Sequence, residues 1–126
     1  MLEVFYVEKP FKVRVCGCRN FNNYELLEIK LNYYLKNKLP NVVIVSGGGK
    51  GADYMGEMYA KKYNLPLEVH RPNWDVDGRS AGPKNNEEIV KNVDAAIAFW
   101  DGKSKGTKHT IDFCKQYKKK CIVVEI

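Results

Sequence analysis

The chain has 126 residues, of which 44% are hydrophobic, and this length suits one compact domain that needs neither disulfides nor metal ions to bury its core. Residues 1–10 carry charges where a signal peptide requires an apolar core, and no run approaches the roughly 20 apolar residues of a membrane span, so we expect a soluble, cytoplasmic protein without a membrane partner. Lysine and arginine exceed aspartate and glutamate by 21 − 15 = 6, an excess that suits an anionic ligand and also permits weak contact with nucleic acid.

Apolar periodicity divides the chain into five strands that alternate with four helices. In chain order we expect a strand at Phe11–Cys16, a helix at 24–35, a strand at Val42–Val45, a helix at 52–63, a strand at Leu67–His70, a helix at 87–92, a strand at Ala95–Trp100, a helix at 107–117 that Thr107 caps, and a strand at Cys121–Ile126. Residues 1–10 precede these elements as a loose arm or as an additional edge strand.

This alternation predicts an α/β fold: a single Rossmann-like, three-layer domain with a mostly parallel five-stranded sheet and helices on both faces. In such sheets the ligand lies beyond the carboxyl ends of the strands. The informative loops are therefore Gly17–Asn20, Gly47–Asp53, His70–Asn86 and Asp101–Thr107. Residues 71–86 form the longest of these connections, and we interpret them as a loop and a candidate lid.

Glycine dominates the turn between the second strand and the second helix. The strand stops at Ser46, and glycines follow at positions 47, 48, 49 and 51. Successive backbone N–H groups without side chains, next to a helix N-terminus, predict a phosphate cradle. Lys50 lies inside this turn. Asp53, in the first helical turn, would bond ribose hydroxyls or act only as a favourable charge.

Two better-known phosphate motifs fit this turn poorly. The spacing Gly47-x-Gly49-x-x-Ala52 satisfies the dinucleotide fingerprint formally, but it follows the second strand and lacks a ribose-binding acid after the next one. The P-loop pattern is absent, because Gly51 stands where serine or threonine should follow Lys50. A plain glycine turn that only permits tight strand-to-helix packing is the remaining alternative.

Other candidate ligand contacts are scattered over the remaining loops. Gly106 and Thr107 open the last helix and would hold a second phosphate or a ribose hydroxyl, or form an ordinary cap on a basic loop. Arg19 would reach an anion across the same edge or lie on the surface. Trp74 and Trp100 would stack on a base or serve in packing.

The chain offers no recognisable catalytic or metal centre by residue pattern. His70 and His109 are its only histidines, and neither serine nor cysteine lies in a nucleophile elbow. The four cysteines form no pair of C-x-x-C motifs, so we expect reduced thiols and no metal site.

Four motifs in order resemble a known family. They are Val13–Phe21 (VRVCGCRNF), Val45–Asp53 (VSGGGKGAD), Trp74 with Gly78–Asn86 (GRSAGPKNN), and Ala98–Thr107 (AFWDGKSKGT). Together they are similar to the YspA-related branch of the SLOG superfamily, which also includes the Smf/DprA DNA-processing proteins and the LOG phosphoribohydrolases. The resemblance runs from about Val13 to Val124 and implies a Rossmann-like domain that binds a nucleotide-derived ligand, including ligands related to NAD or ADP-ribose.

Two departures from the LOG pattern argue against the simplest enzyme. In those hydrolases the motif P-G-G-x-G-T-x-x-E supplies a catalytic glutamate, and the corresponding residue here is Thr110. Asn85 stands where close relatives usually have arginine. A threonine cannot stabilise an oxocarbenium-like transition state as a carboxylate does, so hydrolysis would depend on Asp53 or Asp101 instead.

We therefore predict that residues 1–126 form one SLOG-like domain that requires no cofactor and binds an ADP-ribose-like or NAD-derived nucleotide as a sensor, carrier or sponge. The alternatives are a nucleotide N-glycosidase resembling the phosphoribohydrolases and, less favoured, a DprA-like module for single-stranded nucleic acid that uses the basic helix around Lys115. The family also leads us to expect a homo-oligomer. The candidate ligand-binding residues are Gly17, Cys18, Arg19, Ser46, Gly47, Gly48, Gly49, Lys50, Gly51, Asp53, Trp74, Asp101, Ser104, Lys105, Gly106 and Thr107.

Overall fold

A computed structural model describes residues 2–5 and 8–126 of the chain. Its centre is one five-stranded sheet in the order β3-β2-β1-β4-β5, and every neighbouring pair is parallel. The strands are β1 (Phe11–Gly17), β2 (Val42–Ser46), β3 (Leu67–Val69), β4 (Ala95–Trp100) and β5 (Lys120–Glu125). The predicted α/β class and the parallel sheet are confirmed.

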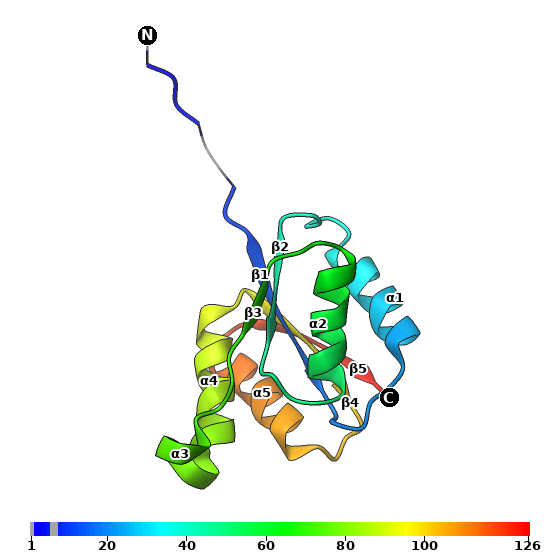
Figure 1. Ribbon diagram of the computed structural model, residues 1–126, viewed down its shortest axis with the longest axis vertical. Helices are drawn as coiled ribbons and strands as arrows, with labels where there is room; N and C mark the ends of the chain where they lie inside the picture. Colours follow the sequence, from blue (N-terminus) through cyan, green and yellow to red (C-terminus); the bar gives the residue numbers. More distant parts are fainter. Residues whose placement is uncertain (1, 6–7) are drawn as a thin grey trace.

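Helices cover both faces of this sheet (Figure 1). They are α1 (Tyr24–Leu35), α2 (Ala52–Lys62), α3 (Trp74–Asp77), α4 (Ala81–Asn92) and α5 (Lys105–Gln116), with a short 3-10 turn at Gly78–Ser80. The first two lie on one face, and α4 and α5 lie on the other. In the described ranges no helix has both the length and the apolar character needed to cross a membrane.

The central strand β1 contributes to both sides of the core because successive side chains of a strand point to opposite faces. Val13 and Val15 pack in the cluster that includes Leu27 of α1 and Tyr59 of α2. Arg14 and Cys16 therefore point toward the α4 and α5 layer. Arg14 is only 3% exposed, an unusual position for an arginine in a strand that is buried on both faces.

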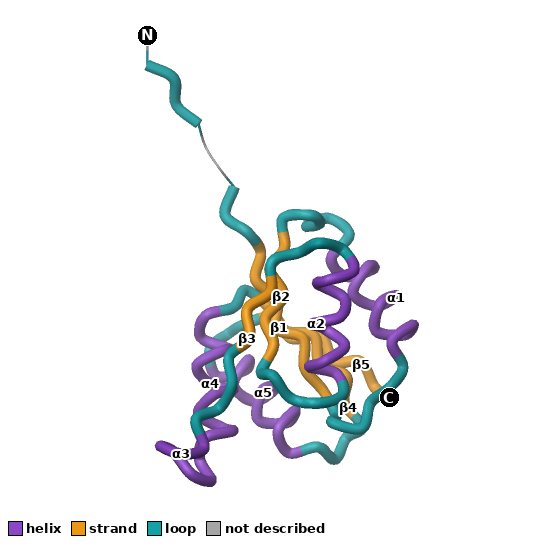
Figure 2. The backbone as a smooth tube through the Cα atoms, viewed as in Figure 1, coloured by secondary structure: helices purple, strands orange, loops and turns teal. Residues whose placement is uncertain are grey.

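The direction of winding reverses between β1 and β4, which are neighbours in the sheet although far apart in the sequence. The loops after β1, β2 and β4 gather at one edge of the sheet (Figure 2). Ligands of open α/β sheets bind at such a switch point. The fold thus brings the predicted loops together at one place.

Two sequence predictions about local structure were wrong. Residues 71–86 are mostly helical and are not a long loop, since α3, the 3-10 turn and the first turn of α4 occupy them. Gly82 and Pro83 suggest a break, but proline is tolerated in the first turn of a helix because no N–H is needed there. Ser104, and not Thr107, caps α5, and its hydroxyl accepts a hydrogen bond from the Thr107 N–H. Of the two alternatives for the N-terminal arm, the edge strand is not found, since residues 2–5 and 8–10 form no strand.

Helices α1 and α2 are joined by a polar cluster around Glu28. Its carboxylate lies 2.6 Å from Lys62 Nζ and accepts hydrogen bonds from the hydroxyls of Tyr63 at 3.0 Å and Tyr24 at 3.4 Å. Lys62 contributes most to lowering the pKa of Glu28 below its ordinary value of 4.5, and both tyrosines add to the effect.

We expect Glu28→Gln to melt at a lower temperature than the wild type at pH 7. A lowered folded-state pKa stabilises the protein above the unfolded value and loses that contribution as the pH falls through the folded-state pKa. The difference in Tm should therefore shrink below about pH 4.5. Thermal unfolding across pH 3–7 measures it, with the exposed Glu25→Gln on the same helix as the control. A difference that does not change with pH would contradict this assignment.

Candidate functional site

A cleft of about 450 Å³ opens at the carboxyl edge of the sheet, where the loops after β1, β2, β3 and β4 meet α3, α4 and α5. It is lined by Arg14, Cys16, Gly17, Arg19, Gly47, Gly48, Gly49, Lys50, Asp53, Arg71, Pro72, Trp74, Gly82, Asn85, Asn86, Ser104, Gly106, Thr107 and Thr110. Four of these residues are basic and one, Asp53, is acidic. The cleft therefore favours an anionic occupant.

The glycine turn is stabilised by hydrogen bonds to the side chains of the two polar residues that flank it, Ser46 and Asp53. The Gly48 N–H donates to Ser46 Oγ at 3.0 Å, and the Gly49 N–H donates to Asp53 Oδ2 at 3.0 Å. Gly48 has a φ of +77°, a conformation that favours glycine. Two of the N–H groups expected to cradle a phosphate thus already have acceptors within the protein. The positive charge available to an anion comes mainly from the side chains beside the turn.

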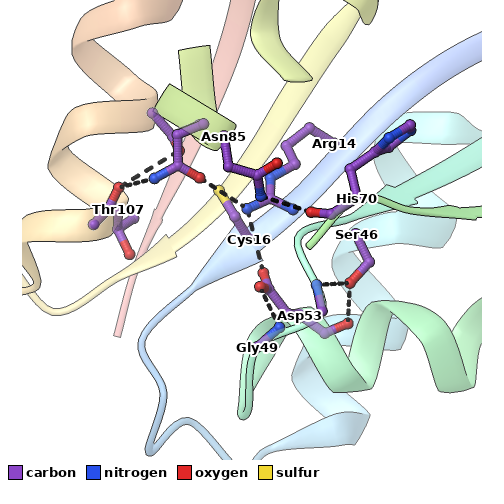
Figure 3. Close-up of polar contacts among 12 residues, drawn as sticks. Arg14, Cys16, Ser46, Gly49, Asp53, His70, Asn85 and Thr107 are labelled. Atoms are coloured by element: carbon purple, nitrogen blue, oxygen red, sulfur yellow. Dashed lines mark hydrogen bonds and ion pairs between the residues drawn. The ribbon is translucent and has the colours of Figure 1, made fainter. Parts of the chain in front are cut away.

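Arg14 provides a buried positive charge at the floor of the cleft (Figure 3). Its Nη2 lies 3.6 Å from Asp53 Oδ1 and donates to Asn86 Oδ1 at 3.4 Å. Its Nε and Nη1 are buried and have no hydrogen-bond partner in the described structure. Each buried donor without a partner costs roughly 1–3 kcal/mol, more when the group is charged. The guanidinium is therefore undersatisfied by the protein groups that surround it.

Asp53 lies between the glycine turn and Arg14. Its side chain is 14% exposed, and burial raises its pKa, while the Arg14 charge and the hydrogen bond from the Gly49 N–H both oppose that rise. Asp53 is thus the acid that holds the turn and partly neutralises Arg14. Its neighbour Cys16 is buried, and this burial raises the pKa of its thiol to about 12, so the environment disfavours the reactive thiolate.

The rim of the cleft carries exposed cations and an aromatic ring. Arg71 donates from Nη1 to the Gly48 carbonyl at 2.8 Å and so lies directly over the glycine turn. Lys50 and Arg19 are exposed at the same rim. Trp74, at the start of α3, is 59% exposed and lies against Gly82, so one face of the cleft ends in an accessible indole.

The opposite wall is the turn before α5. Asp101 accepts hydrogen bonds from the N–H groups of Lys103 at 2.8 Å and Ser104 at 2.9 Å, and these bonds lower its pKa. Ser104 Oγ and Thr107 Oγ1 are 3.0 Å apart. The hydroxyl of Thr110, which is 1% exposed, donates to the Gly106 carbonyl at 3.5 Å. This wall is polar, and the Asp101 carboxylate, which does not line the cleft, is bound to the backbone of the turn.

The structure brings most of the predicted site residues together. Those that line the cleft are Gly17, Arg19, Gly47, Gly48, Gly49, Lys50, Asp53, Trp74, Ser104, Gly106 and Thr107. Five others do not line it: Cys18, Ser46, Gly51, Asp101 and Lys105. Cys18 and Ser46 are buried, and Ser46 donates to Glu57 Oε2 at 2.8 Å. Gly51 and Asp101 shape their turns, and Lys105 begins α5 on the exposed surface.

The sequence prediction missed the floor of the cleft. Its unpredicted lining residues are Arg14, Cys16, Arg71, Pro72, Gly82, Asn85, Asn86 and Thr110. One signal for Arg14 was available, since a basic residue in the middle of a strand that must be buried on both faces requires a specific partner. Asn85 and Asn86 end the third family-like motif, which signalled them without a ligand role, and they enter the cleft through α4. Asn85 donates to the His70 carbonyl at 2.6 Å and ties α4 to the end of β3.

Known proteins resemble this chain in sequence and in fold. The sequence model of the YspA, cpYpsA-related SLOG family matches residues 11–76. Gene 61 protein of Mycobacterium phage D29 is 36% identical in an alignment of 74 residues that covers 54% of this chain and 59% of that protein. The range matched by the family model contains the first three strands and the glycine turn.

Two solved structures share the fold. DNA processing protein A from Streptococcus pneumoniae superposes with a TM-score of 0.71 and 18% identity over 90% of this chain and 50% of that one. Its counterpart from Helicobacter pylori, whose structure was solved for its single-stranded DNA binding mode, gives a TM-score of 0.64 and 21% identity over 91% of this chain and 65% of that one. The chain spans less than two thirds of each of these relatives, and at such identities the structural likeness concerns the fold alone.

Proposed function

Because the chain belongs to the YspA, cpYpsA-related SLOG family, we propose that its cleft binds a nucleotide-derived ligand, ADP-ribose-like or NAD-derived, and that the protein acts as a sensor, carrier or sponge for it. One observation carries this proposal. The buried guanidinium of Arg14 has two donors without partners at the floor of a cleft whose rim holds further cations. An anionic group on the ligand would satisfy those donors.

The shape of the cleft supports a ligand of nucleotide size. Its volume of about 450 Å³ falls within the usual range for small-molecule sites. The exposed indole of Trp74 at the rim offers a face for a base, while the cations lie on the floor and beside the glycine turn. A phosphate at the floor and a base at Trp74 would use the two chemically different parts of the cleft.

The side chains support binding rather than cleavage of the ligand. Thr110 is buried with its hydroxyl bonded to a carbonyl, so it cannot replace a catalytic carboxylate. Asp53 accepts the Gly49 N–H and lies beside Arg14, and Asp101 accepts two N–H groups of its own turn. Both acids are therefore engaged in holding the loops.

Calorimetry against AMP, ADP-ribose, cyclic ADP-ribose isomers and NAD at modest salt tests the proposal. Binding of at least one compound with micromolar or better affinity is expected. A correctly folded protein that binds none of them would contradict the proposed ligand class.

Trp74→Ala tests where the base lies. Stacking on an aromatic side chain contributes about 1–3 kcal/mol per base, so the affinity for an adenine nucleotide should fall roughly 5- to 100-fold. Ribose 5-phosphate, which has no base, should bind wild type and variant equally. Equal losses for both compounds would mean that Trp74 supports the fold of the cleft and does not stack on the base.

A module for single-stranded nucleic acid is the second candidate. The net charge of +6 and the exposed Arg19, Lys50 and Arg71 at the rim favour it. A mobility-shift titration with single-stranded DNA at two salt concentrations tests it. Binding that weakens steeply with salt, and that an excess of free nucleotide does not displace, would favour this candidate over the small ligand.

A further inference from the structure

The undersatisfied guanidinium of Arg14 specifies more about the ligand than its negative charge. We propose that the floor of the cleft binds a terminal phosphate monoester in its dianionic form, held by Arg14, and that it discriminates against an internal phosphodiester. This inference rests on the proposed function and narrows it, among NAD-derived nucleotides, to those that end in a phosphate such as AMP, because every phosphate of ADP-ribose and NAD is internal. Neither the resemblance to the family nor the glycine turn by itself assigns a role to Arg14.

The charge balance at the floor favours a dianion. A Cβ atom placed on Gly47 would lie 2.7 Å from Arg14 Nη2, and one on Gly48 would lie 2.7 Å from Arg71 Nη1. The two guanidinium groups therefore flank consecutive residues of the glycine turn, whose Cα atoms are about 3.8 Å apart. Asp53 is the only acid among the residues that line the cleft. The four basic residues that line the cleft exceed this one carboxylate by three positive charges, an excess that suits the two negative charges of a phosphate monoester.

The burial of Arg14 favours a terminal group. Its side chain is 4% exposed and is covered by Gly47, by Asn86 of α4 and by Asp53 of α2. A phosphate monoester has three free oxygens and one ester link, so it can enter the floor end-on with the rest of the ligand toward the rim. An internal phosphodiester has two free oxygens and a chain leaving on both sides, and the side chains and backbone that cover Arg14 would oppose the second chain. A planar guanidinium also matches two phosphate oxygens at once.

Asp53 is expected to weaken phosphate binding, whereas Arg14 strengthens it. Its carboxylate lies 3.6 Å from the guanidinium and therefore competes with the phosphate for the same positive charge. Replacing the carboxylate with the neutral amide of asparagine keeps an oxygen that accepts from the Gly49 N–H and removes the repulsion. Two neighbouring side chains are thus expected to change affinity in opposite directions, which a purely structural role for either would not produce.

The experiment compares wild type, Arg14→Gln, Arg14→Lys and Asp53→Asn by calorimetry at pH 7.5. Lys61→Gln, an exposed lysine near the far end of α2, serves as the control. The ligands are AMP, adenosine and 3′,5′-cyclic AMP, whose phosphate is a diester. A 5′-phosphorylated oligonucleotide and its 5′-hydroxyl counterpart then separate a free nucleotide from a nucleic-acid end as the source of the monoester.

We expect AMP to bind at least tenfold more tightly than cyclic AMP or adenosine. Loss of the charged, bidentate contact between the guanidinium and the phosphate should lower the affinity for AMP about 100-fold in Arg14→Gln and less in Arg14→Lys. Asp53→Asn should bind AMP several-fold more tightly, and Lys61→Gln should match the wild type. Thermal unfolding of each variant without ligand confirms that it folds, and the tightening in Asp53→Asn tests the site even if Arg14→Gln does not fold.

The outcomes separate this inference from the proposed function. AMP binding that survives Arg14→Gln unchanged, equal affinity for AMP and cyclic AMP, or weaker binding in Asp53→Asn would overturn the floor site and leave nucleotide binding intact. If the wild-type protein binds none of the nucleotides, the proposed function is contradicted. In that case a 5′-phosphorylated oligonucleotide that binds more tightly than its 5′-hydroxyl form, with the preference lost in Arg14→Gln, would still support the floor site, and equal binding would overturn it.

Discussion

Gly51→Ala is expected to lower the free energy of unfolding by about 4 kcal/mol, near the upper end of single substitutions, because it separates the start of α2 from the loop after β1. Gly51 has a φ of +69° and a ψ of −123°, a region that side chains rarely adopt. A Cβ atom there would lie 2.2 Å from the Cys18 carbonyl oxygen and 2.5 Å from that of Arg19. Both obstacles are backbone, so no side-chain rotation relieves them. Denaturant unfolding measures the change.

The matched control is Gly106→Ala. Gly106 lies in the first turn of α5, and a Cβ atom there would meet nothing within 4 Å. Alanine is favoured over glycine in a helix by about 0.5–1 kcal/mol, so this variant should be as stable as the wild type or slightly more so. If Gly51→Ala changed stability no more than Gly106→Ala, the close approach of the two loops would be contradicted.

Gly47→Ala is expected to weaken binding of AMP about 100-fold while changing stability little. Gly47 has an ordinary φ, so alanine adds no backbone strain. Its Cβ atom would lie 2.7 Å from Arg14 Nη2 and 2.8 Å from Nη1. These atoms end a flexible side chain that can move aside, but the moved guanidinium would no longer face the cleft. The expected effect is therefore on the ligand and not on the fold.

Calorimetry with AMP and thermal unfolding of the same sample separate the two effects. Lys61→Ala, which alters α2 outside the cleft, should leave both measurements close to wild type. A Gly47→Ala protein that binds AMP normally would show that the guanidinium keeps its place or is not used. A large fall in Tm would show instead that Arg14 is fixed by the surrounding structure.

The glycine turn was found from the sequence, but its chemistry was only partly predicted. Strand, glycine cluster and helix start are local features, and the sequence places them within a residue or two. The N–H groups of Gly48 and Gly49 turned out to be bonded to Ser46 and Asp53. Those bonds depend on rotamers and on the path of the turn, which no spacing rule specifies.

For residues 71–86 the sequence failed to predict the local structure itself. The glycines and prolines of this stretch indicate a loop when each residue is considered alone, yet α3 and α4 occupy most of it. Helix α4 is stabilised by packing Ile89 and Val90 against the sheet, and tertiary burial outweighs the weak local propensity of Gly82 and Pro83. Asn86 reaches Arg14 only because of this helix.

The sequence by itself determined the order of strands and helices, the parallel class of the sheet and the edge at which the loops meet. Each of these follows from periodicity and turn chemistry within a short window of residues. Only the tertiary structure decided what lies at the floor of the cleft. Arg14 meets a carboxylate from α2 and an amide 72 residues away on α4, since the strand order brings both helices to the end of β1. The role of a buried charge depends on which partners surround it, and here those partners are distant in the sequence and meet only through tertiary packing.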